Sequence, residues 1–329
     1  MKLHENKQLF RQSVRFTAQQ MNIPDIYVEK DYWVTYALFT VFKSSIGSET
    51  VFKGGTALSK CFGLIGRFSE DIDLVVIRHA GEAGNKLTNK IREISRVVSA
   101  VLPEIEISEL THKKGMNRKT AHTYAKEFQG KYGQVRDVIV IEATWLGYFE
   151  PYTKVKVSSF IYEMMLKTDQ QQMAVDYNLQ PFEVLALKPE RTLCEKIMSL
   201  VRFSYSENPI EDLKRKIRHA YDLNQMLLKK ELYEFFQSED FDKMMLKVAK
   251  DDVLSFKNNN SWLGYHPVKA KIFSECEPVW NELKTTYKEE FINLVFGNFP
   301  DESEILETLI KIKIRLAGIN WDINPNLIK

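Results

Sequence analysis

The stretch "VFKGGTALSKCFGLIGRFSEDIDLVV", residues 51–76, most constrains how this chain can fold. An apolar run leads into Gly54 and Gly55, residues at helical spacing follow, and a second apolar run carries Asp71 and Asp73. In a strand, residues i and i+2 point to the same face. The order strand, glycine turn, helix and strand therefore predicts a sheet from which two carboxylates project together.

Two like charges this close repel each other, and a cation between them relieves the repulsion. Mg²⁺ suits such a pair, because it prefers oxygen ligands and completes its shell with water and substrate phosphates. Glu142 follows the apolar run "VIVI" and is expected on a neighbouring strand. Three carboxylates can support in-line nucleotidyl displacement. We therefore predict a metal site at Asp71, Asp73 and Glu142, with a solvated strand end as the alternative reading of the aspartate pair.

The glycine turn predicts a phosphate-binding site just before the acidic pair. Gly54 and Gly55 allow a tight turn and a close approach of the backbone to a ligand. Thr56 is a natural N-cap for a helix that starts after the turn. Free amide groups at a helix N-terminus attract phosphate.

The order of elements predicts an α+β fold: a mixed-sheet domain, residues 1–180, followed by an all-helical domain, residues 181–329. The first part alternates helical and strand patterns, and helical periodicity dominates beyond Pro181. Helices are expected over residues 5–20, 24–42, 56–66, 82–101, 190–204, 211–229, 231–237, 268–296 and 302–316. Strands are expected near residues 51–53, 71–77, 104–110, 136–147 and 154–165.

Composition narrows the functional classes. With 329 residues and 44% hydrophobic residues, the chain can form one large core or two ordinary ones. The net charge of +2 excludes a broadly basic nucleic-acid coat, so any basic patch is local. Three scattered cysteines indicate reduced thiols. The N-terminus has no signal-peptide pattern and no long apolar run occurs, so we expect a cytoplasmic protein without a membrane partner.

The motif "FKGGTALSKCFGLIGRFSEDIDL" resembles the first motif of the AbiEii/AbiGii nucleotidyltransferase-like toxin family, in the DNA polymerase β-type superfamily. The resemblance extends to "VEKDYWVTYAL", "TLCEKIMSLVR" and "RHAYDL", and so spans residues from about 28 to 223. It implies a toxin of an abortive-infection or type IV toxin–antitoxin system with a cognate antitoxin. It also implies binding of NTP with Mg²⁺ and transfer of nucleotides to RNA, with tRNA as the expected acceptor.

The resemblance also implies roles for individual residues. Lys196 would contact the β- and γ-phosphates, although a helix lysine paired with a nearby Glu is the plainer reading. Asp222 would orient Lys196 or contact the acceptor, and Arg67 would close over phosphate or pair with Asp71. The implied catalytic set is Asp71, Asp73, Glu142, Lys196 and Asp222. The implied nucleotide-binding set is Gly54, Gly55, Thr56, Arg67, Ser69 and Lys196.

A locally basic segment, residues 111–136, carries interleaved aromatic residues that could stack on bases. We predict RNA contacts at Lys113, Lys114, Arg118 and Lys119, with a solvated hairpin or an antitoxin-facing surface as alternatives. Two other functions stay open. The chain could move AMP or phosphate to a protein side chain, or it could bind a nucleotide without turnover as an interaction protein.

Overall fold

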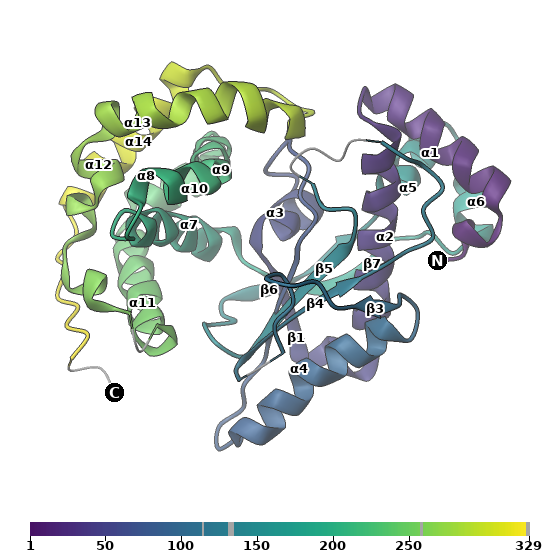
Figure 1. The fold of residues 1–329 in the computed structure, drawn as a ribbon, viewed down its shortest axis with the longest axis horizontal. Helices are drawn as coiled ribbons and strands as arrows, with labels where there is room; N and C mark the ends of the chain where they lie inside the picture. The colour runs from purple at the N-terminus through teal and green to yellow at the C-terminus, as the bar shows by residue number, and fades with distance from the viewer. Residues whose placement is uncertain (114, 131–134, 257–258, 327–329) are drawn as a thin grey trace. The chain divides into compact units, whose positions relative to one another are not determined.

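A computed structural model describes residues 1–113, 115–130, 135–256 and 259–326. The chain divides into two compact units (Figure 1). The sheet unit contains residues 1–63 and 68–187, and the helical unit contains residues 64–67 and 188–329. The division follows Leu187 rather than residue 180, because residues 182–187 form a strand of the sheet.

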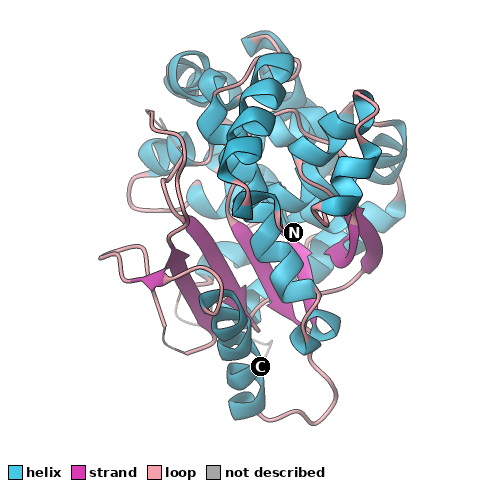
Figure 2. Cartoon of the chain, turned by 90° about the vertical axis from the view of Figure 1, so that its right-hand side faces the viewer, coloured by secondary structure: helices cyan, strands magenta, loops and turns pink. Residues whose placement is uncertain are grey.

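The sheet unit is built on a mixed seven-stranded sheet in the order β3-β4-β5-β2-β1-β7-β6. Its strands are magenta in Figure 2. β2 pairs with β5 in parallel and β1 pairs with β7 in parallel, whereas the other neighbours are antiparallel. The mixed sheet confirms the predicted fold class. The strands are β1 (Thr50–Lys53), β2 (Ile72–Val76), β3 (Glu104–Ile105), β4 (Asn117–His122), β5 (Ile139–Thr144), β6 (Tyr152–Val157) and β7 (Phe182–Leu187).

Helices of the sheet unit cover the sheet face that does not carry Asp73. Phe182 packs on Phe39 with ring centroids 5.3 Å apart, and alternation along β7 places Phe182 on the face opposite Asp73. On β4, Arg118 points to the sheet face opposite that of Lys119, and it donates to the Ser95 hydroxyl at 2.6 Å. The helices are α1 (Lys7–Met21), α2 (Asp25–Phe42), α3 (Gly54–Phe62), α4 (Gly84–Ser99), α5 (Phe160–Lys167) and α6 (Gln171–Asp176). Since Phe39 lies on α2 and Ser95 on α4, both helices pack on that far face.

In residues 188–256 and 259–326 the structure describes helices and no strand, as the sequence predicts for this part. The helix α14 (Glu302–Ala317) starts with a capping box between Asp301 and Glu304, which satisfies two otherwise unpaired amides. The other helices are α7 (Pro189–Phe203), α8 (Pro209–Arg215), α9 (Ile217–Leu227), α10 (Lys230–Gln237), α11 (Glu239–Ser255), α12 (Lys271–Ser274) and α13 (Cys276–Thr285).

Several element predictions are wrong in detail. The strand β4 was not predicted, because its residues are mostly polar and alternate only weakly in polarity. Residues 154–165 form the end of β6 and then α5, and residues 211–229 are divided at Lys216 into α8 and α9. The long helix α11 was not predicted. No helix in the described ranges has both the length and the apolar character that crossing a bilayer requires.

Candidate active site

Strand register places the predicted acids on one face of the sheet. Asp73 lies on β2 directly beside Glu142 on the parallel strand β5. Residues paired in this way share a face, and Asp71 lies two residues before Asp73. The expectation that Glu142 lies on a neighbouring strand of the same sheet is therefore confirmed.

Asp73 has a strongly perturbed acidity. Burial is the largest cause, and the negative charges of Glu142 and Asp71 add to it, so that the pKa of Asp73 is raised to about 7. Lys53 and Lys119 oppose this rise without cancelling it. The Asp73 carboxylate thus lies in an environment that favours a bound proton or a bound cation.

The other two acids each have a basic partner that the sequence analysis did not place there. Arg136 Nη1 lies 3.0 Å from Asp71 Oδ1, and Lys119 Nζ lies 3.1 Å from Glu142 Oε2. Asn117 donates to Glu142 Oε1 at 3.1 Å. All of these side chains are partly exposed, so the ion pairs are weak enough to exchange for other partners.

The donor set fits a divalent cation in part. Asp71 and Asp73 offer carboxylate oxygens from the same side of one strand, and the raised pKa of Asp73 reflects uncompensated negative charge. In the part of the chain that the structure describes, no three His, Cys, Asp or Glu side chains converge closely enough to hold one ion. Glu142 could join only if it released Lys119.

Gly54 has a specific reason to be glycine. Its φ of +78° lies in the left-handed region, which disfavours residues with a Cβ. A Cβ built on Gly54 would lie 2.2 Å from Asp73 Oδ2. The missing side chain therefore makes room for the Asp73 carboxylate at the start of α3.

Thr56 braces the loop between the turn and the acids. Its hydroxyl donates to the Asp71 carbonyl at 2.6 Å and lies 3.0 Å from the Ser69 hydroxyl. The predicted N-cap role of Thr56 is wrong, because α3 already starts at Gly54 and its N-cap is Lys53. The glycine turn itself is part of the first helical turn, so the predicted start was two residues late.

A buried network supports the residues around Asp71. Lys30 forms an ion pair with Glu70 and donates to the Arg136 carbonyl, and Glu70 Oε1 accepts from the Arg136 amide at 2.9 Å. This network holds the backbone of Arg136, whose side chain contacts Asp71. Asp31 pairs with Lys60 at 2.5 Å in the same unit. Lys30 and Asp31 on α2 thus both form buried salt bridges in this unit.

The helical unit contains a second charged cluster. Arg67 donates to both oxygens of Asp222 at 2.7 Å, and Lys196 Nζ donates to Asp222 Oδ2 at 2.7 Å. Burial pushes the pKa of Asp222 upward, but the charges of Arg67 and Lys196 outweigh it and hold that pKa far below its usual range. Lys196 is only 6% exposed, so it is not a solvated helix lysine. Arg67 therefore pairs with Asp222, a partner that the sequence analysis did not name.

His219 lies beside this cluster. It is half-buried as a residue, but its Nδ1 is buried and has no hydrogen-bond partner in the described ranges. Burial is the largest cause that lowers its pKa, and Lys196 and Lys216 lower it further. His219 is therefore neutral at physiological pH.

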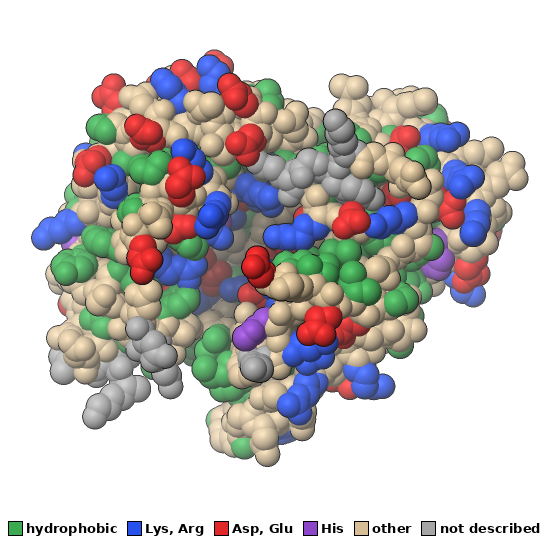
Figure 3. All heavy atoms as spheres, viewed as in Figure 1, with side chains coloured by type: hydrophobic (Ala, Val, Ile, Leu, Met, Phe, Trp, Pro, Cys, Tyr) green, Lys and Arg blue, Asp and Glu red, His purple; other side chains and the backbone are tan. Residues whose placement is uncertain are grey.

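The basic segment contributes few uncommitted cations. Lys113 pairs with Glu104 at 2.6 Å, while Arg118 and Lys119 are engaged with Ser95 and Glu142. Lys114 lies outside the described residues. Figure 3 shows basic and acidic side chains interspersed over the visible face, in keeping with the net charge of +2. The predicted RNA contacts at these positions stay a prediction.

Comparison with known proteins shows the family and a similar fold. The model of one family, the nucleotidyl transferase AbiEii toxin of type IV toxin–antitoxin systems, matches residues 36–293. Among solved structures, the nucleotidyltransferase toxin MenT4 from Mycobacterium tuberculosis is similar, with a TM-score of 0.56 and 15% sequence identity. The similarity covers 94% of this chain and 91% of MenT4. No curated protein matches the chain.

Proposed function

Since the chain belongs to the AbiEii nucleotidyltransferase toxin family, we propose that it transfers a nucleotide from NTP to a hydroxyl of RNA, with tRNA as acceptor. In this reaction the acceptor oxygen forms a bond to the α-phosphorus. The bond from that phosphorus to the pyrophosphate oxygen breaks, and pyrophosphate leaves with the bonding electrons. The family also implies an antitoxin partner and NTP as substrate.

The observation that carries the proposal is the juxtaposition of Asp71, Asp73 and Glu142 beside the turn at Gly54. One of these carboxylates would take the proton that the acceptor hydroxyl loses, and the raised pKa of Asp73 marks the negative charge gathered on this face. The amides at the start of α3 and the side chain of Arg136 are the nearby groups of positive character that suit a triphosphate.

We further propose that Asp71 and Asp73 hold Mg²⁺, with Glu142 as an additional ligand after Lys119 releases it. A divalent cation held there would neutralise negative charge on the phosphates. Within the helical unit, Lys196, oriented by Asp222, and Arg67 are proposed as phosphate contacts. Thr56 and Ser69 would act by fixing the loop that carries Asp71.

The experiment that tests the proposal incubates the purified chain with total cellular RNA, Mg²⁺ and each NTP labelled at the α-phosphate. Asp71→Ala is the test variant, and Asp322→Ala replaces an exposed aspartate of the helical unit as the matched control. We expect label on a tRNA-sized band with the wild type and Asp322→Ala, and none with Asp71→Ala. Chelation of the metal should abolish labelling, and added Mg²⁺ should restore it.

The same gel separates the alternatives. Label on protein instead of RNA would indicate that the acceptor is a protein side chain and not RNA. Tight NTP binding without label on either acceptor would indicate an interaction protein without turnover. Full RNA labelling by a folded Asp71→Ala variant would contradict the proposed metal site.

A further inference from the structure

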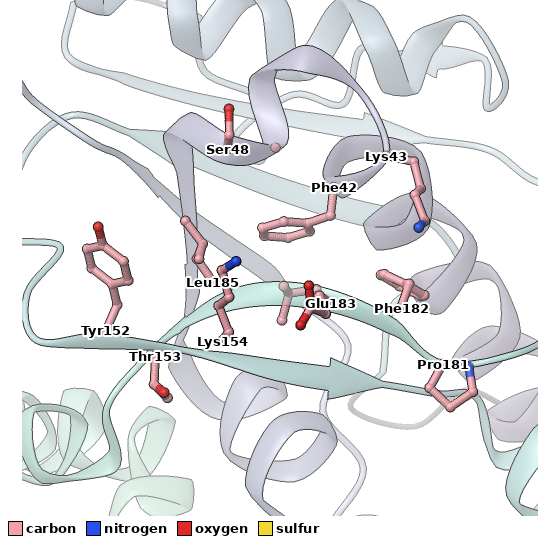
Figure 4. A pocket seen from close by; sticks show the side chains of 12 residues that line it. Phe42, Lys43, Ser48, Tyr152, Thr153, Lys154, Pro181, Phe182, Glu183 and Leu185 are labelled. Atoms are coloured by element: carbon pink, nitrogen blue, oxygen red, sulfur yellow. The ribbon is translucent and has the colours of Figure 1, made fainter.

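A groove of about 730 Å³ lies on the sheet unit beside the edge strand β6 (Figure 4). Tyr152, Leu185 and Lys154 project into it from the last two strands, and Phe42 faces them from the end of α2 (Figure 4). Its other charged lining residues are Lys43 and Glu183. The volume suits a nucleotide-sized group.

Three lining residues of the groove, Tyr152, Lys154 and Leu185, lie on the sheet face that carries the acids. Lys53 is opposite Asp73, and the pairing of Phe52 with Ala186 places Lys53 level with Leu187. Leu187 is in turn opposite Tyr152. Asp73 and Tyr152 therefore lie in one row across the sheet, three strand spacings or roughly 14 Å apart.

The groove has two lysines, Lys43 and Lys154, and Lys156 lies beyond its lining on β6, opposite Glu183. All three lysines are exposed, and none of them forms a salt bridge or side-chain hydrogen bond with another described residue. Lys156 follows Lys154 on the same face of β6. In contrast, the described cations of the basic segment at Lys113 and Lys119 are ion-paired. The groove thus offers free positive charge where the predicted RNA contacts do not.

Aromatic side chains accompany this charge. Tyr152 is 37% exposed and its ring lies 6.3 Å from that of Phe149, which leaves part of the Tyr152 ring open to a ligand. Phe42 lies across the groove from it. An exposed ring such as Tyr152 next to uncommitted lysines is a combination that binds single-stranded nucleic acid, because bases stack and phosphates pair with ammonium groups.

We propose that this groove and the exposed face of β6 bind a single-stranded part of the RNA acceptor, with a base on Tyr152 and phosphates on Lys154 and Lys156. The inference rests on the proposed function and adds the surface that holds the acceptor. An edge strand can also accept a peptide strand, but the two lysines of the groove and Lys156 beside it, against the single acid Glu183, favour a polyanion.

The test measures binding of labelled tRNA and of a single-stranded oligoribonucleotide by the full chain without NTP. Tyr152→Ala should weaken binding about fivefold or more, whereas Tyr152→Phe should keep it because stacking is preserved. Lys154→Glu should lower the slope of log affinity against log salt by about 0.7 for each phosphate that the protein no longer neutralises. Lys167→Glu, the same charge change on an exposed lysine of α5, should leave both quantities unchanged.

Turnover assays complete the test. In the groove variants the KM for RNA should rise, while the KM for NTP and kcat at saturating RNA stay at wild-type values. Unchanged RNA affinity in Tyr152→Ala and Lys154→Glu overturns the proposal, even if the chain labels RNA as the proposed function requires. Mononucleotides that bind the groove as tightly as the oligoribonucleotide, or a peptide that binds in place of RNA, would also overturn it.

Discussion

Replacing Gly54 by alanine tests whether the glycine turn exists to make room for the Asp73 carboxylate. At φ +78° an alanine carries a left-handed backbone strain of about 1–2 kcal/mol. The new Cβ would lie 2.2 Å from Asp73 Oδ2 and 3.1 Å from Asp73 Cγ, so the carboxylate has to move. Overpacking of this kind costs about 1–3 kcal/mol. The free energy of unfolding should therefore fall by about 2–5 kcal/mol in total.

Gly81 offers a matched control. Its φ is +75°, and a Cβ built on it meets nothing within 4 Å. Gly81→Ala therefore carries the same backbone strain of about 1–2 kcal/mol without the steric term. Urea unfolding of both variants isolates the contact with Asp73 as a difference of about 1–3 kcal/mol. Nucleotide transfer should be lost in Gly54→Ala and retained in Gly81→Ala.

A double-mutant cycle sharpens the comparison. In an Asp73→Ala background, Gly54→Ala no longer displaces a carboxylate, so its cost should fall toward that of Gly81→Ala. The reasoning fails if Gly54→Ala and Gly81→Ala lose the same stability. It also fails if Gly54→Ala transfers nucleotides at the wild-type rate.

Two further predictions concern buried charges. Asp222→Ala leaves Arg67 and Lys196 buried without their shared carboxylate, so the free energy of unfolding should fall by about 3–5 kcal/mol, against less than about 0.5 kcal/mol for the exposed Asp322→Ala. Burial raises the pKa of Glu29 from 4.5 to about 7, so the folded chain binds more protons than the unfolded chain between these values. Stability should accordingly decrease by about 3 kcal/mol as pH rises from 4.5 to 7, and denaturation of Glu29→Gln should show a flatter profile.

The acidic face could be predicted because it depends on local patterns. The spacing of Asp71 and Asp73 follows from strand alternation, and the apolar run before Glu142 indicates a strand. The sequence could not indicate how these acids are neutralised. Arg136 and Lys119 come from a polar segment whose strand β4 shows little alternation, and the pairing of Lys119 with Glu142 depends on register between β4 and β5.

The sequence could not predict long-range ion pairs for a different reason. Arg67 precedes the acidic pair by only a few residues, so Asp71 was a natural candidate partner. Its actual partner, Asp222, lies 155 residues away in the chain. Charge alone cannot choose between two carboxylates, and only the fold decides which one is buried beside the guanidinium.

Residues 64–67 belong to the helical unit, so the gene segments that encode the two units cannot be exchanged at a single junction. A fragment that encodes residues 188–329 alone lacks Arg67, so Asp222 would keep only the ammonium of Lys196 as a buried counter-charge. A fragment that ends at residue 187 contains residues 64–67 but lacks the rest of the helical unit to which they belong. Recombination between relatives would therefore have to exchange a short internal peptide together with the C-terminal half. Residues 64–67 and 188–329 should therefore be inherited together from the same parent.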